Sequence, residues 1–267
     1  MSAEDHDKRA PSSVPSSGPW GRPAPEPTNQ RPPRDGYAVR GKWRLPGSVL
    51  VFVLIMLSVG IRAYKDLSQP EAWAYWKDLY FSPSLTSSVT TIGDLDGSGR
   101  RVTALAVRGE IGAAAASWFR DRLDEAHLAA GDTVLLSSLG GNLGQALIMG
   151  EVIRSRGLTT AVGVVDGSGA IAPSHCASAC VLVYAGGKAR FGVEGSVLGV
   201  HRFVTTAPEP DPVAETQRTT GIVLSYMTRM GVSSSVVEAM SATTAIRWLT
   251  AKEAAAMNLV TDPSRTR

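Results

Sequence analysis

Three short segments in the second half of the chain carry residue types suited to acyl-transfer chemistry. The first, residues 137–142 (Ser-Ser-Leu-Gly-Gly-Asn), has glycines that let backbone N–H groups approach a substrate closely. The second, residues 176–180 (Cys-Ala-Ser-Ala-Cys), places Ser178 at the expected start of a short apolar helix. Free N–H groups and the helix dipole there favour an anionic transition state. The third is His201, a candidate general base at the expected end of a strand.

Read together, in this order and spacing, the segments resemble the proteolytic subunit of Clp protease, within the wider Clp/crotonase fold. The resemblance runs from Val107 to Asp262. Its motifs are Val107–Ile111, the Gly-Gly turn at 139–141, Ala177-Ser178-Ala179, Arg190-Phe191 with Ser196 and His201, and 247–260. It implies an α/β fold of repeated ββα units, with a mainly parallel sheet flanked by helices.

Carried over residue by residue, the resemblance implies the roles of a serine peptidase. Ser178 would be the nucleophile and His201 its base. The oxyanion hole would come from the Gly140–Gly141 turn and Ala179, chiefly from the N–H groups of Gly140 and Ala179. The expected substrate is a peptide or protein, self-association into a homo-oligomer is compatible with the family, and no cofactor is expected.

The chain departs from the family at three places. Ile246 stands where the family has its catalytic Asp, so His201 lacks its usual orienting carboxylate. Ser241, Thr243, Thr244 or a carboxylate elsewhere could replace it, or the site could work as a Ser–His dyad. The loop 166–175 is longer than in the family, and the segments that dock an unfoldase are not recognisable.

Cys176 and Cys180 flank Ser178 symmetrically. In helical geometry their Cα atoms would lie about 6 Å apart, within disulfide range. The alternative is a pair of small buried hydrophobic residues. A zinc site with His175 and His201 would have four ligands, but their spacing matches no standard zinc motif, so no metal is expected.

The uncharged run Leu45–Ile61 predicts one transmembrane helix, placed at 45–63. Five cationic side chains precede it closely and only Arg62 and Lys65 follow it, which predicts a cytoplasmic N-terminus and a periplasmic or otherwise extracytoplasmic C-terminal domain. The location is therefore the inner (plasma) membrane, in a single pass. A core helix of a soluble domain is the alternative.

The rest of the chain divides around this helix. Residues 1–44, rich in Pro, Ser and Arg, predict a disordered tail. Residues 64–87 form a juxtamembrane segment whose aromatic side chains indicate either an interfacial belt or a helix packed on the domain. Residues 88–267 form the Clp/crotonase-like domain. The net charge of +3 without a basic, aromatic stripe argues against nucleic acid as a partner.

Strands and helices alternate through this domain, which predicts βαβ units and a largely parallel sheet. Asn142, Asp211 and the Thr250–Glu253 capping box mark three helix starts. The expected elements are strands 88–93, 102–108, 133–136, 159–165, 196–201 and 259–260, and helices 113–128, 142–156, a short one ending at 186–187, 212–231 and 250–258.

These features favour a membrane-anchored serine hydrolase, acting as a peptidase outside the cytoplasm through an acyl-enzyme on Ser178. A catalytically inactive binding or assembly module is the first alternative, and Ile246 is its main support. A crotonase-like acyl-CoA enzyme is the second, disfavoured by the Ser178–His201 pair.

Overall fold

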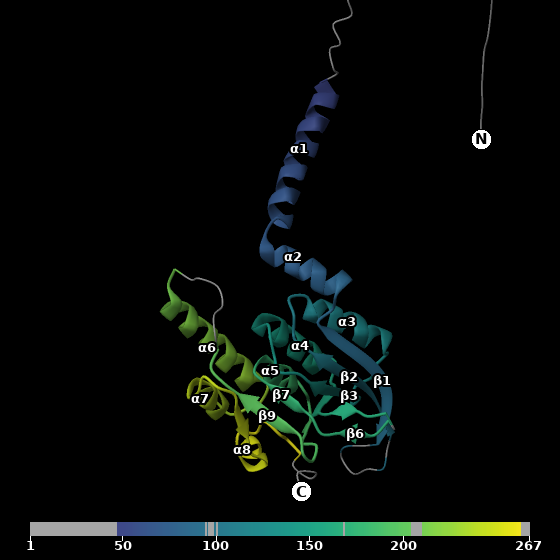
Figure 1. Cartoon of the computed structure of the whole chain (residues 1–267), viewed down its shortest axis with the longest axis vertical. Coiled ribbons are helices and arrows are strands. Elements are labelled where there is room, and N and C mark those ends of the chain that lie inside the picture. The colour runs from purple at the N-terminus through teal and green to yellow at the C-terminus, as the bar shows by residue number, and fades with distance from the viewer. Residues whose placement is uncertain are drawn as a thin grey trace, which may run out of the picture. The chain divides into compact units, whose positions relative to one another are not determined.

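The structure is a computed structural model, and it describes residues 47–93, 95, 99, 101–167, 169–203 and 210–262. The expected tail 1–44 and the start of the expected transmembrane helix lie outside these residues. Figure 1 labels most of the helices and strands.

Helix α1 (Gly47–Leu67) is the one described helix long and apolar enough to cross a membrane. Its mean hydropathy is 2.0 and none of its residues is buried. At 1.5 Å per residue, its 21 residues extend about 31 Å, of which the uncharged part, residues 47–61, takes about 22 Å. It continues four residues beyond the expected end at 63, because Tyr64–Leu67 carry no helix-breaking residue.

The segment after α1 is helical and not a simple linker. Helix α2 (Pro70–Trp76) begins at a proline, which is well suited to a first helical position, and continues into the π-helical turn η1 (Lys77–Phe81). Strand β1 (Leu85–Gly93) then begins three residues earlier than expected.

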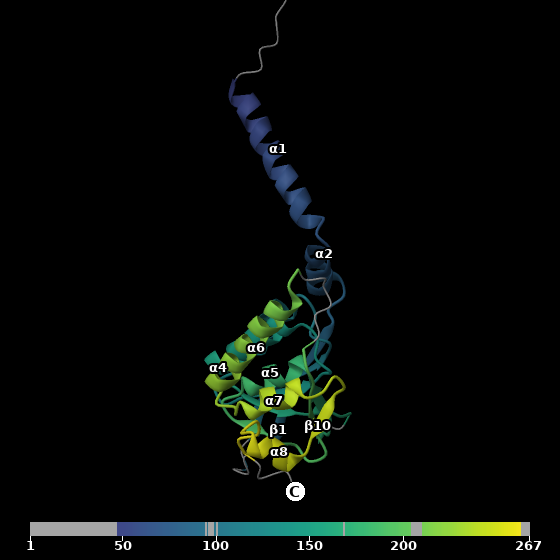
Figure 2. The same cartoon turned by 90° about the vertical axis from the view of Figure 1, so that its left-hand side faces the viewer.

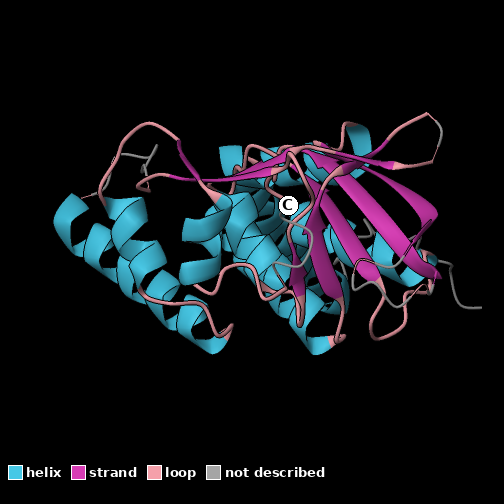
Figure 3. Ribbon diagram, turned by 90° about the horizontal axis from the view of Figure 1, so that it is seen from below, coloured by secondary structure: helices cyan, strands magenta, loops and turns pink. Residues whose placement is uncertain are grey.

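The main sheet has five strands in the order β1-β2-β3-β4-β8. Strands β2 (Arg101–Gly109), β3 (Thr133–Ser137), β4 (Thr159–Val162) and β8 (Arg190–Phe191) are parallel, and β1 pairs antiparallel with β2. This is the mixed α/β architecture with a mainly parallel sheet that the alternating pattern predicts. Figure 3 shows the strands of this sheet side by side, with most of the helices to one side.

Helices α3 (Ala115–Glu125) and α4 (Leu143–Ser155) make the crossovers between parallel strands. Central strand β3 is buried along its whole length. Its side chains alternate, so Val134 and Leu136 join the large core cluster and Leu135 joins a smaller one on the other face. Asn142 caps α4 by accepting a hydrogen bond from the Gln145 N–H (3.0 Å), as expected.

A second sheet, in the order β10-β9-β7, holds the strands that bracket the candidate site. Strand β7 (His175–Ala177) is parallel to β9 (Val197–Val200), and β10 (Arg247–Leu249) is antiparallel to β9. Helix α5 (Ala179–Ala185) follows β7 after a single residue. Strand β10 was not expected, because three residues are too few to show a hydrophobic period.

The C-terminal part is helical: α6 (Pro212–Arg229), α7 (Ser235–Ser241) and α8 (Ala251–Ala256). Helix α6 lies beside α4 (Figure 2), and Arg229 pairs there with Glu151. The expected caps at Asp211 and at Thr250–Glu253 are present. Hydrogen bonds from the Thr250 N–H and hydroxyl and from Arg247 lower the pKa of Glu253 to about 2.

Two strands expected from the sequence are not formed as predicted, and one helix was not predicted. The strand expected at 159–165 is broken at Gly163, where a Cβ would lie 2.8 Å from Ile171. The loop that follows contains a hairpin of β5 (Val164–Val165) and β6 (Ile171–Ala172). Residues 259–260 form no strand, and helix α7 was not expected.

Arg190 ties the ends of three helices together. Its side chain is only 2% exposed and donates to five backbone carbonyl groups at the C-terminal ends of α5, α6 and α8. Burial lowers the pKa of Arg190, while the nearby Tyr184 phenol acts in the opposite direction. The acceptors are the carbonyl oxygens of Ala185, Gly187, Met230, Asn258 and Leu259, at 2.8 to 3.5 Å.

Candidate active site

Ser178 occupies a sharp turn between a strand and a helix. It is the only described residue between β7 and α5, and its backbone has φ 57° and ψ −127°. A positive φ is unfavourable for a residue with a side chain, so the turn must be held by its neighbours. One of them is β9, whose Gly199 carbonyl accepts a hydrogen bond from the Ser178 N–H at 2.9 Å.

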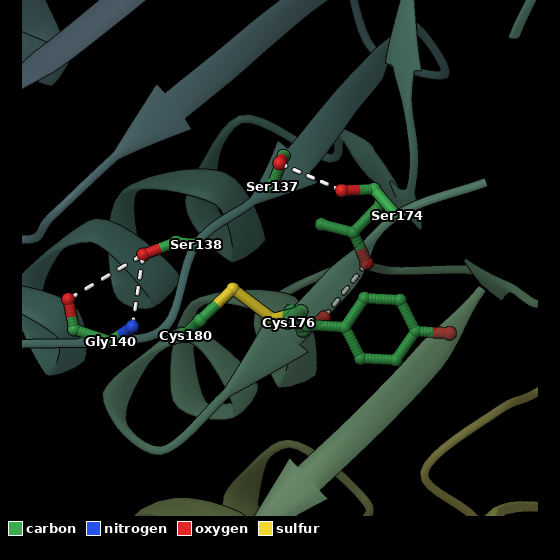
Figure 4. Close-up of a disulfide and its surroundings, with 8 residues drawn as sticks. Ser137, Ser138, Gly140, Ser174, Cys176 and Cys180 are labelled. Atoms are coloured by element: carbon green, nitrogen blue, oxygen red, sulfur yellow. Dashed lines mark hydrogen bonds between the residues drawn. A yellow bond between two sulfur atoms is a disulfide. The ribbon is translucent and has the colours of Figure 1, made fainter. Parts of the chain in front are cut away.

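A disulfide between the two cysteines constrains this turn. Cys176 on β7 and Cys180 in α5 are fully buried and joined in a disulfide, with Cα atoms 5.3 Å apart. The assumption that both lie on one helix is wrong, because Cys176 belongs to the strand before the turn. The bond, shown in Figure 4, therefore links strand β7 to helix α5. Ser178 lies between these two elements.

The expected glycine turn packs directly on Ser178. A Cβ on Gly140 would lie 2.7 Å from the Ser178 Cβ and 2.9 Å from the Ala179 nitrogen, closer than a side chain allows. Gly140 also has φ +104°, a value that favours glycine. Residue 140 must therefore be glycine if the two segments are to meet.

The three expected oxyanion-hole amides differ in what they contact. The Gly140 N–H donates to the hydroxyl of the buried Ser138 at 3.0 Å, so it is already paired (Figure 4). Within the described part of the chain, the N–H groups of Gly141 and Ala179 have no hydrogen-bond partner. These two amides are the ones available to an oxyanion.

Ser178 and His201 line the same cavity, of about 590 Å³. His201 follows the last residue of β9, as expected. Glu110 and Thr219 add polar groups, and the remaining wall is formed by Ile111, Gly112, Ala113, Gly141, Asn142, Leu143, Ala179 and Phe203. The structure thus brings the three sequence segments to one opening.

The Nδ1 atom of His201 is buried and has no hydrogen-bond partner among the described residues. The pairing of β9 and β10 ends at Val200 and Arg247, so His201 and Ile246 are the first residues beyond it. Residue 246, the expected place of an orienting Asp, is thus an isoleucine at the end of this pairing. The suggested substitute Thr243 donates its hydroxyl to the Ala245 carbonyl instead.

A second cavity, of about 520 Å³, adjoins the first and shares Glu110 and Gly141 with it. His175, considered above only as a zinc ligand, lies there with Arg108 and Ser174, and its ring meets Trp248 edge-on at 6.4 Å. Ser138 and Glu110 lie within the sequence motifs 137–142 and 107–111, but the sequence assigned neither of them a role in the site.

No protein-family model and no curated protein matches this sequence. Among solved structures, ClpP1 from Listeria monocytogenes matches with a TM-score of 0.47 and 16% identity, covering 59% of this chain and 88% of that one. A mutant of the 1510-N membrane-bound stomatin-specific protease matches with a TM-score of 0.44 and 15% identity, covering 59% and 75%. At this level of likeness neither structure identifies the family of this chain.

Proposed function

We propose that the chain is a Clp/crotonase-like serine hydrolase that cleaves peptide bonds in polypeptide substrates through an acyl-enzyme. The observation that carries the proposal is the single cavity lined by Ser178, His201 and two unpaired backbone amides, those of Gly141 and Ala179. A nucleophile, a base and an oxyanion site are the groups that acyl transfer requires.

In the proposed reaction the Ser178 Oγ attacks the scissile carbonyl carbon, and His201 Nε2 takes the hydroxyl proton. The Gly141 and Ala179 N–H groups donate to the carbonyl oxygen as it becomes negative; removing one such donor typically costs 10²–10³-fold in kcat. The protonated His201 then gives its proton to the leaving amine, and water hydrolyses the ester on Ser178.

The second candidate is a binding or assembly module that no longer catalyses, and the unpartnered Nδ1 of His201 favours it. A catalytic imidazole carries a proton on Nδ1 when Nε2 is the base, and that N–H needs an acceptor to hold the ring. A buried donor without an acceptor costs about 1–3 kcal/mol. The two candidates therefore differ in whether Ser178 is reactive.

We also propose that α1 anchors the domain in the inner membrane, with residues 1–44 in the cytoplasm and residues 88–267 in the periplasm or its equivalent. The length and hydropathy of α1 support a span. The Cys176–Cys180 disulfide supports an oxidising compartment for the domain. Self-association of the domain stays a prediction.

Labelling with a fluorophosphonate tests whether Ser178 is nucleophilic. We expect the detergent-solubilised full chain to be labelled, and the Ser178→Ala and His201→Ala variants to lose both labelling and peptidase turnover. The double variant should be hardly worse than either single one, because the residues act as a unit. Ser174→Ala, which changes a serine of the neighbouring cavity, is the matched control and should keep its label. A folded wild-type chain that resists labelling would leave the binding module as the better account.

A further inference from the structure

The segment α2–η1 has two different faces. Four aromatic side chains of one face remain largely exposed: Trp73 (61%), Trp76 (41%), Tyr80 (66%) and Phe81 (74%). They associate with one another, since the rings of Trp76 and Tyr80 stack at 5.4 Å and those of Trp73 and Phe81 lie 6.4 Å apart. Large exposed apolar side chains gathered on one short segment are typical of an interaction site.

The opposite face is fixed to the domain by hydrogen bonds. The Tyr75 hydroxyl meets the Ser117 hydroxyl at 3.1 Å. The Asp78 carboxylate accepts from the Ala114 N–H (2.8 Å) and from the Ser84 N–H (2.9 Å). Ala114 stands at the N-cap of α3 and has no side-chain acceptor of its own, so Asp78 caps that helix. These contacts hold the aromatic face outward.

The distance along the chain indicates what this face contacts. Eight residues, 62–69, separate the end of the apolar run at Ile61 from Pro70. In helical geometry they extend about 12 Å. The headgroup layer beyond the hydrocarbon core is about 5–7 Å thick on each side. If α1 spans a bilayer, the aromatic face therefore begins within a side chain's reach of the headgroups, where Trp and Tyr are preferentially found.

We propose that the aromatic face of α2–η1 lies in the lipid headgroup layer next to the α1 span. The proposal rests on the membrane anchoring proposed above, but not on the hydrolase activity. Both interpretations from the sequence, an interfacial belt and a helix packed on the domain, then apply, because one face packs on the domain and the other contacts lipid.

The arrangement also ties the candidate active site to the bilayer. A Cβ on Gly112 would lie 2.4 Å from the Asp78 carboxylate, so Asp78 packs against the backbone at Gly112. Gly112 and its neighbour Ala113 line the cavity of Ser178 and His201. The segment that contacts lipid thus also supports one wall of this cavity, which would keep the opening near the membrane surface.

Quenching of tryptophan emission by brominated lipid tests the proposal. The full chain is reconstituted in phosphatidylcholine vesicles with bromine at acyl carbons 6 and 7, close to the headgroups. Trp20 and Trp43, which precede the span, are changed to Phe in every sample. We expect the brominated lipid to quench most of the emission of Trp73 and Trp76, and this quenching to disappear in Trp73→Phe/Trp76→Phe.

Trp248→Phe is the matched control, because Trp248 is as exposed (44%) as Trp76 but lies on β10. It should leave the quenched part of the emission unchanged. Flotation of the vesicles gives a separate readout of anchoring. A chain that floats with the vesicles, but shows equal quenching with and without Trp73 and Trp76, would overturn the lipid contact alone. A chain that does not float would overturn the anchoring and this inference with it, while fluorophosphonate labelling would still decide the hydrolase.

Discussion

Two side chains with buried nitrogen atoms, Arg190 and His201, differ in whether those nitrogens have hydrogen-bond acceptors. Arg190 donates to carbonyl oxygens from the ends of three helices, and all its donor nitrogens have acceptors. His201, placed one residue beyond β9, has a buried Nδ1 with no acceptor in the described structure. Buried polar groups are normally paired, because an unpaired one loses its water without compensation. The difference indicates that Arg190 serves stability, whereas His201 is placed for something other than stability.

The largest loss of stability should follow from removing the hydrogen-bonded side chain of Arg190. Arg190→Met would leave the carbonyl oxygens of Gly187, Asn258 and Leu259 without their donor, each costing about 1–3 kcal/mol, whereas those of Ala185 and Met230 still accept from Arg154. We expect a loss of at least about 3 kcal/mol in the free energy of unfolding, read from denaturant melts of the detergent-solubilised chain. Arg229→Met is the matched control: it removes an exposed pair with Glu151, worth about 0–1 kcal/mol. Equal losses in the two variants would contradict the structural role of Arg190.

The disulfide should have the next largest effect, because it holds the strand and helix on both sides of Ser178. Its five-residue loop is short, and loop-closure entropy gives about 2 kcal/mol for such a link. We expect Cys176→Ser/Cys180→Ser to lose about that much stability and to lower the rate of fluorophosphonate labelling. In the wild type, both thiols should resist alkylation after acid quenching until a reductant is added. Full alkylation without reductant would exclude the bond in the isolated protein.

A hydrogen-bond acceptor for His201 can be introduced by mutation, since its Nδ1 lacks the kind of acceptor that the nitrogens of Arg190 have. Ile246→Asp places a carboxylate directly before β10, at the end of its pairing with the strand that His201 follows. If only the orienting group is missing, labelling and turnover should rise about tenfold or more, since this carboxylate contributes orders of magnitude in serine proteases. Ile246→Asn is the matched control, because its amide can accept a hydrogen bond but carries no charge. Unchanged rates in a folded Ile246→Asp chain would favour the binding module.

Sequence reasoning succeeded where a local signal exists and failed where long-range contacts decide. The caps at Asn142, Asp211 and Thr250 are read from side chains three residues from their partners, and all three are present. Strand β10 and helix α7 are too short to show a period. The missing carboxylate at Ile246 was visible in the sequence. That residue 246 lies at the end of the β9–β10 pairing became clear only from the structure.

The backbone conformation of Ser178 also could not be predicted from the sequence. Nothing in Cys-Ala-Ser-Ala-Cys distinguishes a helical serine from one at φ 57°. The turn results from contacts distant in the chain: Gly199 accepts its N–H, and Gly140 packs on its side chain. Residues that such contacts force into a disfavoured conformation are concentrated at functional sites.

The smallest expected effect is a change in the free energy of unfolding when the backbone strain at Ser178 is relieved. Glycine adopts φ 57° with ψ −127° without steric cost, whereas a residue with a side chain pays about 1–3 kcal/mol in such regions. Glycine therefore gains stability by relieving this strain, but part of the gain is offset by its greater backbone entropy in the unfolded chain. We therefore expect Ser178→Gly to be about 1 kcal/mol more stable than Ser178→Ala in denaturant melts, with both unlabelled by fluorophosphonate. Ala177→Gly is the matched control, because residue 177 belongs to strand β7 and has no positive φ, so the change should destabilise the domain. If Ser178→Gly were instead the less stable of the two Ser178 variants, the turn would not be strained. The backbone of Ser178 would then be no evidence that the fold gives up stability to place this side chain.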